Sequence, residues 1–116
     1  MAARNTYQLL VDYDFKIPLL KRLQLKLFES NMKKTLSFLQ DECYITTKNI
    51  LKVPSKHGMH YYITVQTRYN LKPEHLLLIQ SLLGDDKNRC IFNLNRLLLG
   101  WPWKANNILF QENEIH

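Results

Sequence analysis

Apolar and polar residues follow two different periods along this chain, and each period predicts one type of element. Residues 7–13, Tyr-Gln-Leu-Leu-Val-Asp-Tyr, form a short apolar run that is typical of a buried strand. Between residues 16 and 39, apolar side chains return mostly at every third or fourth position, which predicts an amphipathic helix. Pro18 suits the first turn of that helix, and Ser30-Asn31 marks a place where it can break in two.

The middle of the chain predicts a β-hairpin. Residues 42–53 and 59–67 contain many of the β-branched and aromatic residues that strands favour. The segment 52–58 between them holds proline, serine and glycine, so we expect it to form the turn. The hairpin is therefore predicted to be antiparallel, with a polar loop at its tip.

A second helix and a last strand complete the predicted order of elements. The helix is expected at residues 72–83, with Pro73 at its start and Gly84 at its stop, and the strand at residues 89–94. The resulting order, β-α-β-β-α-β, predicts an α+β fold of the ferredoxin-like or RRM-like type, with an antiparallel sheet and the helices on one face. Right-handed crossovers would place the first and third strands at the centre of the sheet.

The length of 116 residues predicts a single domain with one core. We expect this core to span about residues 7–96 and to be followed by a C-terminal tail at residues 97–116. Three aromatic side chains of the tail are expected to cover an edge of the core, namely Trp101, Trp103 and Phe110.

Charge and cysteine content narrow the possible partners. The chain has 16 Lys and Arg against 10 Asp and Glu, a net charge of +6, which favours a polyanionic partner, although a lysine excess also serves solubility.

Cys43 and Cys90 lack zinc-site spacing and are expected at opposite sheet edges, so neither a zinc site nor a disulfide is predicted. Isolated cysteines favour a reducing, cytoplasmic location. The apolar runs are too short to span a membrane, and we expect no membrane contact.

Two carboxylates close the first predicted strand. Asp12 and Asp14 are separated by one residue, so on a strand both point to the same face. Two adjacent carboxylates repel each other unless a cation lies between them, and Mg²⁺ favours carboxylates together with phosphate oxygens. The alternative is an acidic strand end that caps the following helix.

The loop of the predicted hairpin carries groups suited to a triphosphate. Residues 55–60, Ser-Lys-His-Gly-Met-His, offer a hydroxyl, an ammonium, two imidazoles and a glycine that lets the main chain approach a ligand. Strand alternation places His60 and Tyr62 on one face, which is also the face of Asp12 and Asp14 if the sheet order holds. The alternative is an ordinary polar hairpin tip with surface histidines.

Three further features have structural alternatives of similar or greater weight. Asn93 and Asn95 close the predicted last strand, where one of them would approach the two aspartates and offer a carbonyl ligand, although an asparagine commonly just ends a strand. Residues 84–89, Gly-Asp-Asp-Lys-Asn-Arg, are interpreted as a structural turn. Five cations of the first helix could contact a phosphate backbone, but they also suit a solvated face: Lys21, Arg22, Lys26, Lys33 and Lys34.

These motifs resemble those of the archaeo-eukaryotic primase (primase-polymerase) superfamily. Residues 9–14, Leu-Leu-Val-Asp-Tyr-Asp, are similar to the first motif, an apolar strand that ends in Asp-x-Asp, and residues 55–60 are similar to the second, Ser-x-x-Gly-x-His. The resemblance implies an RRM-like palm domain, Mg²⁺ or Mn²⁺ bound by the aspartates, and nucleoside triphosphate and single-stranded DNA or RNA as partners. It also implies phosphate contacts from Ser55, Lys56 and His60. Together with the chemistry of the loop, we predict catalysis by Asp12, Asp14 and His60, and nucleotide binding by Ser55, Lys56, His57, Gly58 and His60.

The third family motif, an apolar strand that ends in a metal-binding aspartate, is altered in this chain. The aligned position is Asn93, which we take as the third metal ligand beside Asp12 and Asp14. The sequence therefore predicts a primase- or polymerase-like nucleotidyltransferase of replication, minimal or degenerate, of a size that fits an archaeal virus or plasmid acting in the host cytoplasm. The alternatives are a catalytically degenerate, RRM-like nucleic-acid-binding protein and a structural protein that forms a homodimer through its tail.

Overall fold

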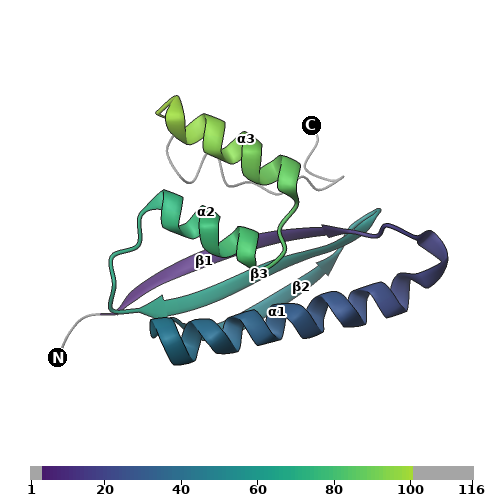
Figure 1. Ribbon diagram of the computed structural model, residues 1–116, viewed down its shortest axis with the longest axis horizontal. Coiled ribbons are helices and arrows are strands. Elements are labelled where there is room, and N and C mark those ends of the chain that lie inside the picture. The colour runs from purple at the N-terminus through teal and green to yellow at the C-terminus, as the bar shows by residue number, and fades with distance from the viewer. Residues whose placement is uncertain (1–3, 101–116) are drawn as a thin grey trace.

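The computed structural model describes residues 4–100, including all of their side chains except those at 87–89 and 92. Its centre is a three-stranded antiparallel sheet built from β1 (Asn5–Asp14), β2 (Thr46–Pro54) and β3 (Gly58–Thr67) (Figure 1). The strand order is β1-β3-β2, so the predicted hairpin forms and β3 pairs with both neighbours. The α+β class and the antiparallel sheet are confirmed.

Two helices follow the predicted positions. A 3₁₀ turn, η1 (Pro18–Leu20), leads into α1 (Lys21–Cys43), which is continuous through Ser30-Asn31, so the predicted break there is wrong. Threonine and serine are tolerated in a helix that buries one face. The hydroxyl of Thr35 donates a hydrogen bond to the main-chain carbonyl of Asn31, one turn earlier in the helix. Helix α2 (Pro73–Leu82) begins at the expected proline and ends before Gly84, whose φ of 99° only glycine adopts readily.

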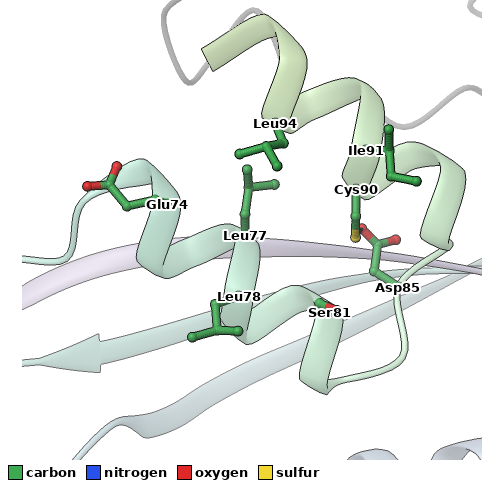
Figure 2. Close-up of a pocket in the computed structure, with 8 residues that line it drawn as sticks. All are labelled: Glu74, Leu77, Leu78, Ser81, Asp85, Cys90, Ile91 and Leu94. Carbon is green, nitrogen blue, oxygen red and sulfur yellow. Dashed lines mark hydrogen bonds between the residues drawn. The ribbon is translucent and has the colours of Figure 1, made fainter. Parts of the chain in front are cut away.

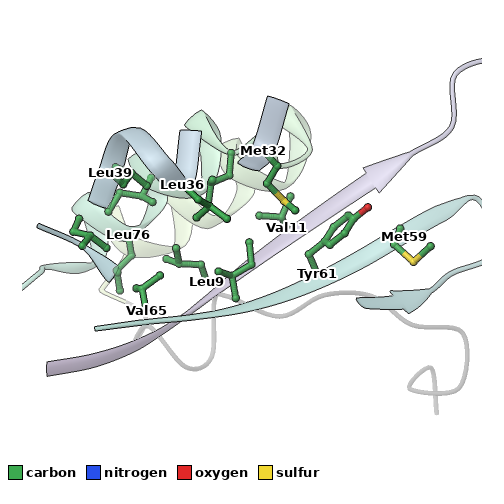
Figure 3. Close-up of a cluster of buried hydrophobic side chains, with 13 residues drawn as sticks. Leu9, Val11, Met32, Leu36, Leu39, Met59, Tyr61, Val65 and Leu76 are labelled. Carbon is green, nitrogen blue, oxygen red and sulfur yellow. The ribbon is translucent and has the colours of Figure 1, made fainter. Parts of the chain in front are cut away.

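The hydrophobic core lies between these two helices and one face of the sheet. The side chains at alternate positions of β1 and β3 point toward the helices, as the period of two requires (Figure 3). Both helices contribute buried residues to the same cluster, so the prediction that the helices cover one face is confirmed for α1 and α2. The cluster consists of Leu9, Val11, Met32, Leu36, Leu39, Ile45, Met59, Tyr61, Ile63, Val65, Leu76, Ile79 and Leu83.

The predicted last strand is wrong. Residues Lys87–Leu98 form a helix, α3, which lies beside α2 on the side away from the sheet (Figure 1). Ile91, Leu94 and Leu98 recur at helical spacing, and this longer pattern outweighs the six-residue run that suggested a strand. A three-to-four-residue period needs a window longer than six residues to be distinguished from a strand.

Within residues 4–100 no fourth strand is present, so β1 is an edge strand and β3 is the central one, which corrects the predicted placement of β1. The outer edge of β1 is not left bare, because side chains accept its main-chain hydrogens. The N–H of Leu10 donates to Gln80 Oε1 at 2.9 Å, and the N–H of Asp12 donates to Asp85 Oδ1 at 2.8 Å. These side chains replace part of the pairing that another strand would supply.

Cys43 and Cys90 are free cysteines. Both lie on helices, Cys43 at the end of α1 and Cys90 on α3, so their predicted positions at the edges of the sheet are wrong. Among the described residues no helix is both long and apolar enough to cross a bilayer. The expectations for Trp101, Trp103 and Phe110 fall outside the described residues.

Candidate acidic site at the end of β1

Asp12 and His60 are direct partners across the β1–β3 pair. Their neighbours Val11 and Tyr61 belong to the core beneath the helices, so Asp12 and His60 lie on the opposite face of the sheet. His60 Nε2 lies 3.2 Å from Asp12 Oδ1, and the histidine is 2% exposed. The structure therefore brings together two predicted site residues that are far apart in the sequence.

The loop of the hairpin is attached to the same end of β1. Asp14 pairs with Gly58, and the N–H of Phe15 donates to the carbonyl of His57 at 2.7 Å. Inside the loop, the N–H of Ser55 donates to the carbonyl of Gly58 at 3.1 Å. The segment that contains Ser55, Lys56 and His57 is thus held beside the acidic end of β1.

Gly58 has a packing role in this arrangement. A Cβ atom added at residue 58 would lie 1.7 Å from the carbonyl oxygen of Tyr13, a distance at which the backbone of β1 must move. The close approach of two strands therefore requires glycine here, whether or not a nucleotide binds. The predicted contact of Gly58 with phosphate stays a prediction.

A third carboxylate joins Asp12 and Asp14, and it comes from Asp86. One oxygen atom from each of these three side chains lies within 4.8 Å of the others, and all three residues are partly buried. Carboxylate oxygens are the ligands that hard divalent cations prefer, so this donor set fits Mg²⁺ or Mn²⁺. The turn interpretation of residues 84–89 missed Asp86, which lies between α2 and α3.

Asp85, the neighbour of Asp86, is 8% exposed. Its Oδ1 accepts hydrogen bonds from the N–H groups of Asp12, at 2.8 Å, and of Asp86, at 2.9 Å. Its Oδ2 accepts from the thiol of Cys90 at 3.4 Å. Asp85 therefore contacts the main chain of two members of the acidic cluster.

Asn93 lies on α3 and is 1% exposed. Its proposed proximity to Asp12 and Asp14 rested on a strand that is a helix in the structure, so that argument fails. Its Nδ2 has no hydrogen-bond partner among the described residues. The oxygen that the structure does bring to the two aspartates belongs to Asp86.

An aromatic stack supports the acidic end of β1 from the opposite face of the sheet. The rings of Tyr13 and Phe28 are stacked with centroids 4.2 Å apart, and Phe28 also contacts Tyr61 at 5.7 Å. Burial raises the pKa of the Tyr13 hydroxyl. A Cβ atom at Gly84 would lie 2.6 Å from Phe28, so the start of the α2–α3 loop packs against the same stack.

A polar network continues from this stack. Tyr61 donates a hydrogen bond of 2.6 Å to Glu29 Oε2, which also pairs with Lys52 Nζ at 2.7 Å. Burial alone would raise the pKa of the Glu29 carboxyl, but the hydrogen bonds from Lys52 and Tyr61 and the charges of Lys52 and Lys33 lower it. Burial, and then the hydrogen bond to Glu29, raise the pKa of Tyr61.

A separate apolar groove of about 540 Å³ lies between α2 and α3 (Figure 2). Leu77, Leu78, Ile91 and Leu94 form half of its lining, and Asp85 and Cys90 lie at one end. The groove and the acidic cluster therefore share the α2–α3 loop as a common border.

Comparison with models of protein families, with curated proteins and with solved structures finds no match for this chain.

Proposed function

We propose that this protein is a divalent-cation-dependent nucleotidyltransferase of the primase-polymerase type, which acts on nucleoside triphosphates and single-stranded nucleic acid. The observation that carries the proposal is the convergence of Asp12, Asp14 and Asp86 within 4.8 Å. Three carboxylates at this separation repel one another strongly, and a divalent cation relieves that repulsion.

The acidic residues have distinct structural origins that suit a rigid cation site. Asp12 and Asp14 project from a strand whose register with β3 is fixed, and Asp86 stands just before the first turn of α3. When bound, Mg²⁺ or Mn²⁺ would neutralise phosphate oxygens and align the attacking and leaving groups of a phosphoryl transfer. In this proposal, the protein's own contribution is to hold the carboxylates in a fixed geometry.

His60 is assigned the role of orienting Asp12. Its Nε2 lies 3.2 Å from Asp12 Oδ1, and its burial keeps that contact away from competing water. A fixed Asp12 keeps its carboxylate directed toward the cluster with Asp14 and Asp86. The histidine thus supports the acidic site from the neighbouring strand.

The hairpin loop is assigned the binding of the triphosphate. The Phe15–His57 hydrogen bond of 2.7 Å keeps the loop next to Asp14, so a nucleotide on the cations would have the loop within reach. Lys56 is exposed and supplies a positive charge, and Ser55 supplies a hydroxyl donor. These groups match the charge of a triphosphate.

The test is incorporation of labelled nucleotides on a single-stranded template in the presence of Mn²⁺ or Mg²⁺. The wild-type chain is expected to extend or make primers, and Asp12→Asn and Asp86→Asn are expected to lower the rate at least about a hundredfold. Asp41→Asn is the matched control, because Asp41 is an exposed acid near the C-terminal end of α1 and is not part of the acidic cluster. Equal activity in all variants, or none in the wild type with either metal, would contradict the proposal.

A second candidate is a non-catalytic protein of the same fold that binds nucleic acid, and the exposed cations of α1 favour it. Five lysine and arginine side chains on this helix are exposed: Lys21, Arg22, Lys26, Lys33 and Lys34. Single-strand binding that needs no metal, weakens steeply with salt and is unaffected by Asp14→Ala would support this candidate over the enzyme.

A further inference from the structure

Asp85 differs from the three clustered carboxylates in what its oxygens contact. It is 8% exposed, and its Oδ1 accepts hydrogen bonds from two main-chain N–H groups, those of Asp12 and Asp86. Its Oδ2 accepts from the thiol of Cys90, and Figure 2 shows the carboxylate and the sulfur side by side below α3. A buried carboxylate in such contacts acts through hydrogen-bond geometry more than through access to a ligand.

The two N–H groups belong to residues of the acidic cluster that come from different elements. Asp12 is on β1, and Asp86 is in the loop that leads into α3. Because a single oxygen atom of Asp85 accepts from both, the main chains of Asp12 and Asp86 are kept at a fixed separation. The hydrogen bond between Cys90 and Oδ2 adds a contact to α3.

This link contacts the outer edge of β1, where the described part of the chain offers no further strand. Side chains from the α2 side of the molecule contact this edge of β1, Gln80 at Leu10 and Asp85 at Asp12. Asp85 is the side chain that makes such a contact next to the acidic cluster. The separation between Asp12 and Asp86 therefore depends on the length of the Asp85 side chain.

Gln80 makes a similar contact with the main chain of β1, two residues before Asp12. Its Oε1 accepts from the N–H of Leu10 on the same edge of β1 at 2.9 Å, and the residue is fully buried. Removing this bond would destabilise the edge of β1 and leave the hydrogen bonds from Asp12 and Asp86 to Asp85 Oδ1 in place. Gln80 is therefore a matched control for a purely structural effect.

We propose that Asp85 is a positioning residue of the cation site, which sets the spacing between Asp12 and Asp86 through main-chain hydrogen bonds without itself being a ligand. This inference rests on the proposed function. Side chains that orient metal ligands commonly contribute ten- to a hundredfold to metal affinity. The acceptor geometry of Asp85, and not its charge, is the property that matters.

Two conservative variants separate geometry from charge. Asp85→Asn keeps an oxygen acceptor at the same distance and removes the charge, while Asp85→Glu keeps the charge and displaces the acceptor by one methylene. The measurement is Mn²⁺ affinity of the full chain by electron paramagnetic resonance, at a temperature where circular dichroism shows every variant folded. Asp85→Ala and Gln80→Ala are measured alongside.

We expect Asp85→Asn to bind Mn²⁺ within about threefold of the wild type, and Asp85→Glu and Asp85→Ala to bind it at least about tenfold more weakly. Gln80→Ala should melt at a lower temperature but keep its Mn²⁺ affinity. A loss in Asp85→Asn would overturn the inference, because it would make the charge essential. Unchanged affinity in folded Asp85→Glu and Asp85→Ala would overturn it too.

The test of Asp85 as a positioning residue does not require every variant to fold. If Asp85→Glu and Asp85→Ala are unfolded, the Asp85→Asn result stands alone: wild-type affinity supports positioning by the acceptor, and weakened affinity overturns it. A wild-type chain that binds no Mn²⁺ overturns both this inference and the proposed function. A wild-type chain that binds, with variants that bind equally well, overturns this inference alone.

Discussion

Tyr61 on β3 donates a hydrogen bond of 2.6 Å to Glu29 on α1, and this bond joins the central strand to the long helix behind the acidic site. Lys52 on β2 pairs with the same carboxylate oxygen at 2.7 Å. One acidic side chain thus links a helix to two strands. The ring of Tyr61 contacts the ring of Phe28, and Phe28 stacks on Tyr13, the residue between Asp12 and Asp14.

The Glu29 contact predicts a loss of stability in acid. Its pKa is lower in the folded chain than the ordinary value of 4.5, so its contribution is complete above about pH 4.5 and is lost as the pH falls through the folded-state pKa. Glu29→Gln keeps an acceptor for Tyr61 but loses the charge beside Lys52, and we expect a cost of about 1 kcal/mol at neutral pH. Urea unfolding at pH 7 and pH 3.5 measures this cost. The difference in the free energy of unfolding between variant and wild type should be smaller at pH 3.5.

Tyr61 gives the opposite dependence at high pH. Its pKa is raised, so the stabilisation is present below the ordinary tyrosine pKa of 10.0 and is lost as the pH rises toward the raised folded-state value. Tyr61→Phe keeps the ring contact with Phe28 and removes the hydroxyl. In thermal melts, we expect the melting temperature of this variant to fall less between pH 9 and pH 11 than that of the wild type. Parallel curves for the two proteins would contradict this assignment.

Gly58→Ala tests the close approach of β1 and β3. The added Cβ would lie 1.7 Å from the carbonyl oxygen of Tyr13, so we expect a loss of at least about 2 kcal/mol in the free energy of unfolding. Gly100→Ala is the comparison, because a Cβ there meets no atom within 4 Å and only the φ of 86° opposes it. An equal or larger loss at residue 100 would show that contact with β1 is not the cause.

Lys56→Ala tests the role of the hairpin loop. In the proposed function Lys56 contacts the triphosphate, so this variant should bind nucleotide several-fold more weakly while its Mn²⁺ affinity stays unchanged. Lys48→Ala is the control, since Lys48 is also an exposed lysine but lies on β2, near the end of that strand away from the hairpin loop. Isothermal titration with a nucleoside triphosphate and Mn²⁺ gives both numbers. Equal weakening by the two substitutions would indicate a general charge effect.

The sequence was sufficient for the elements whose patterns are long or bounded by clear turn residues. The hairpin and the pairing of β1 with β3 followed from strand periodicity and chain order, and they brought Asp12 next to His60. The predicted strand at residues 89–94 failed because a six-residue apolar run fits a strand and a buried helix face equally well. The wrong strand also explains why Asp86 was missed. A strand at residues 89–94 would have covered the edge of β1, whereas in the structure the α2–α3 loop reaches that edge and brings Asp86 beside Asp12.

The central claim is that Asp12, Asp14 and Asp86 form one cation site, and Mn²⁺ titration of the wild type and of Asp86→Asn tests it most directly. The substitution keeps the size of the side chain and removes one of three charges, with Asp41→Asn as a control for net charge. The account predicts saturable Mn²⁺ binding by the wild type and by Asp41→Asn, and at least about tenfold weaker binding by folded Asp86→Asn. Equal affinity of Asp86→Asn and the wild type, or no saturable binding at all, would contradict it.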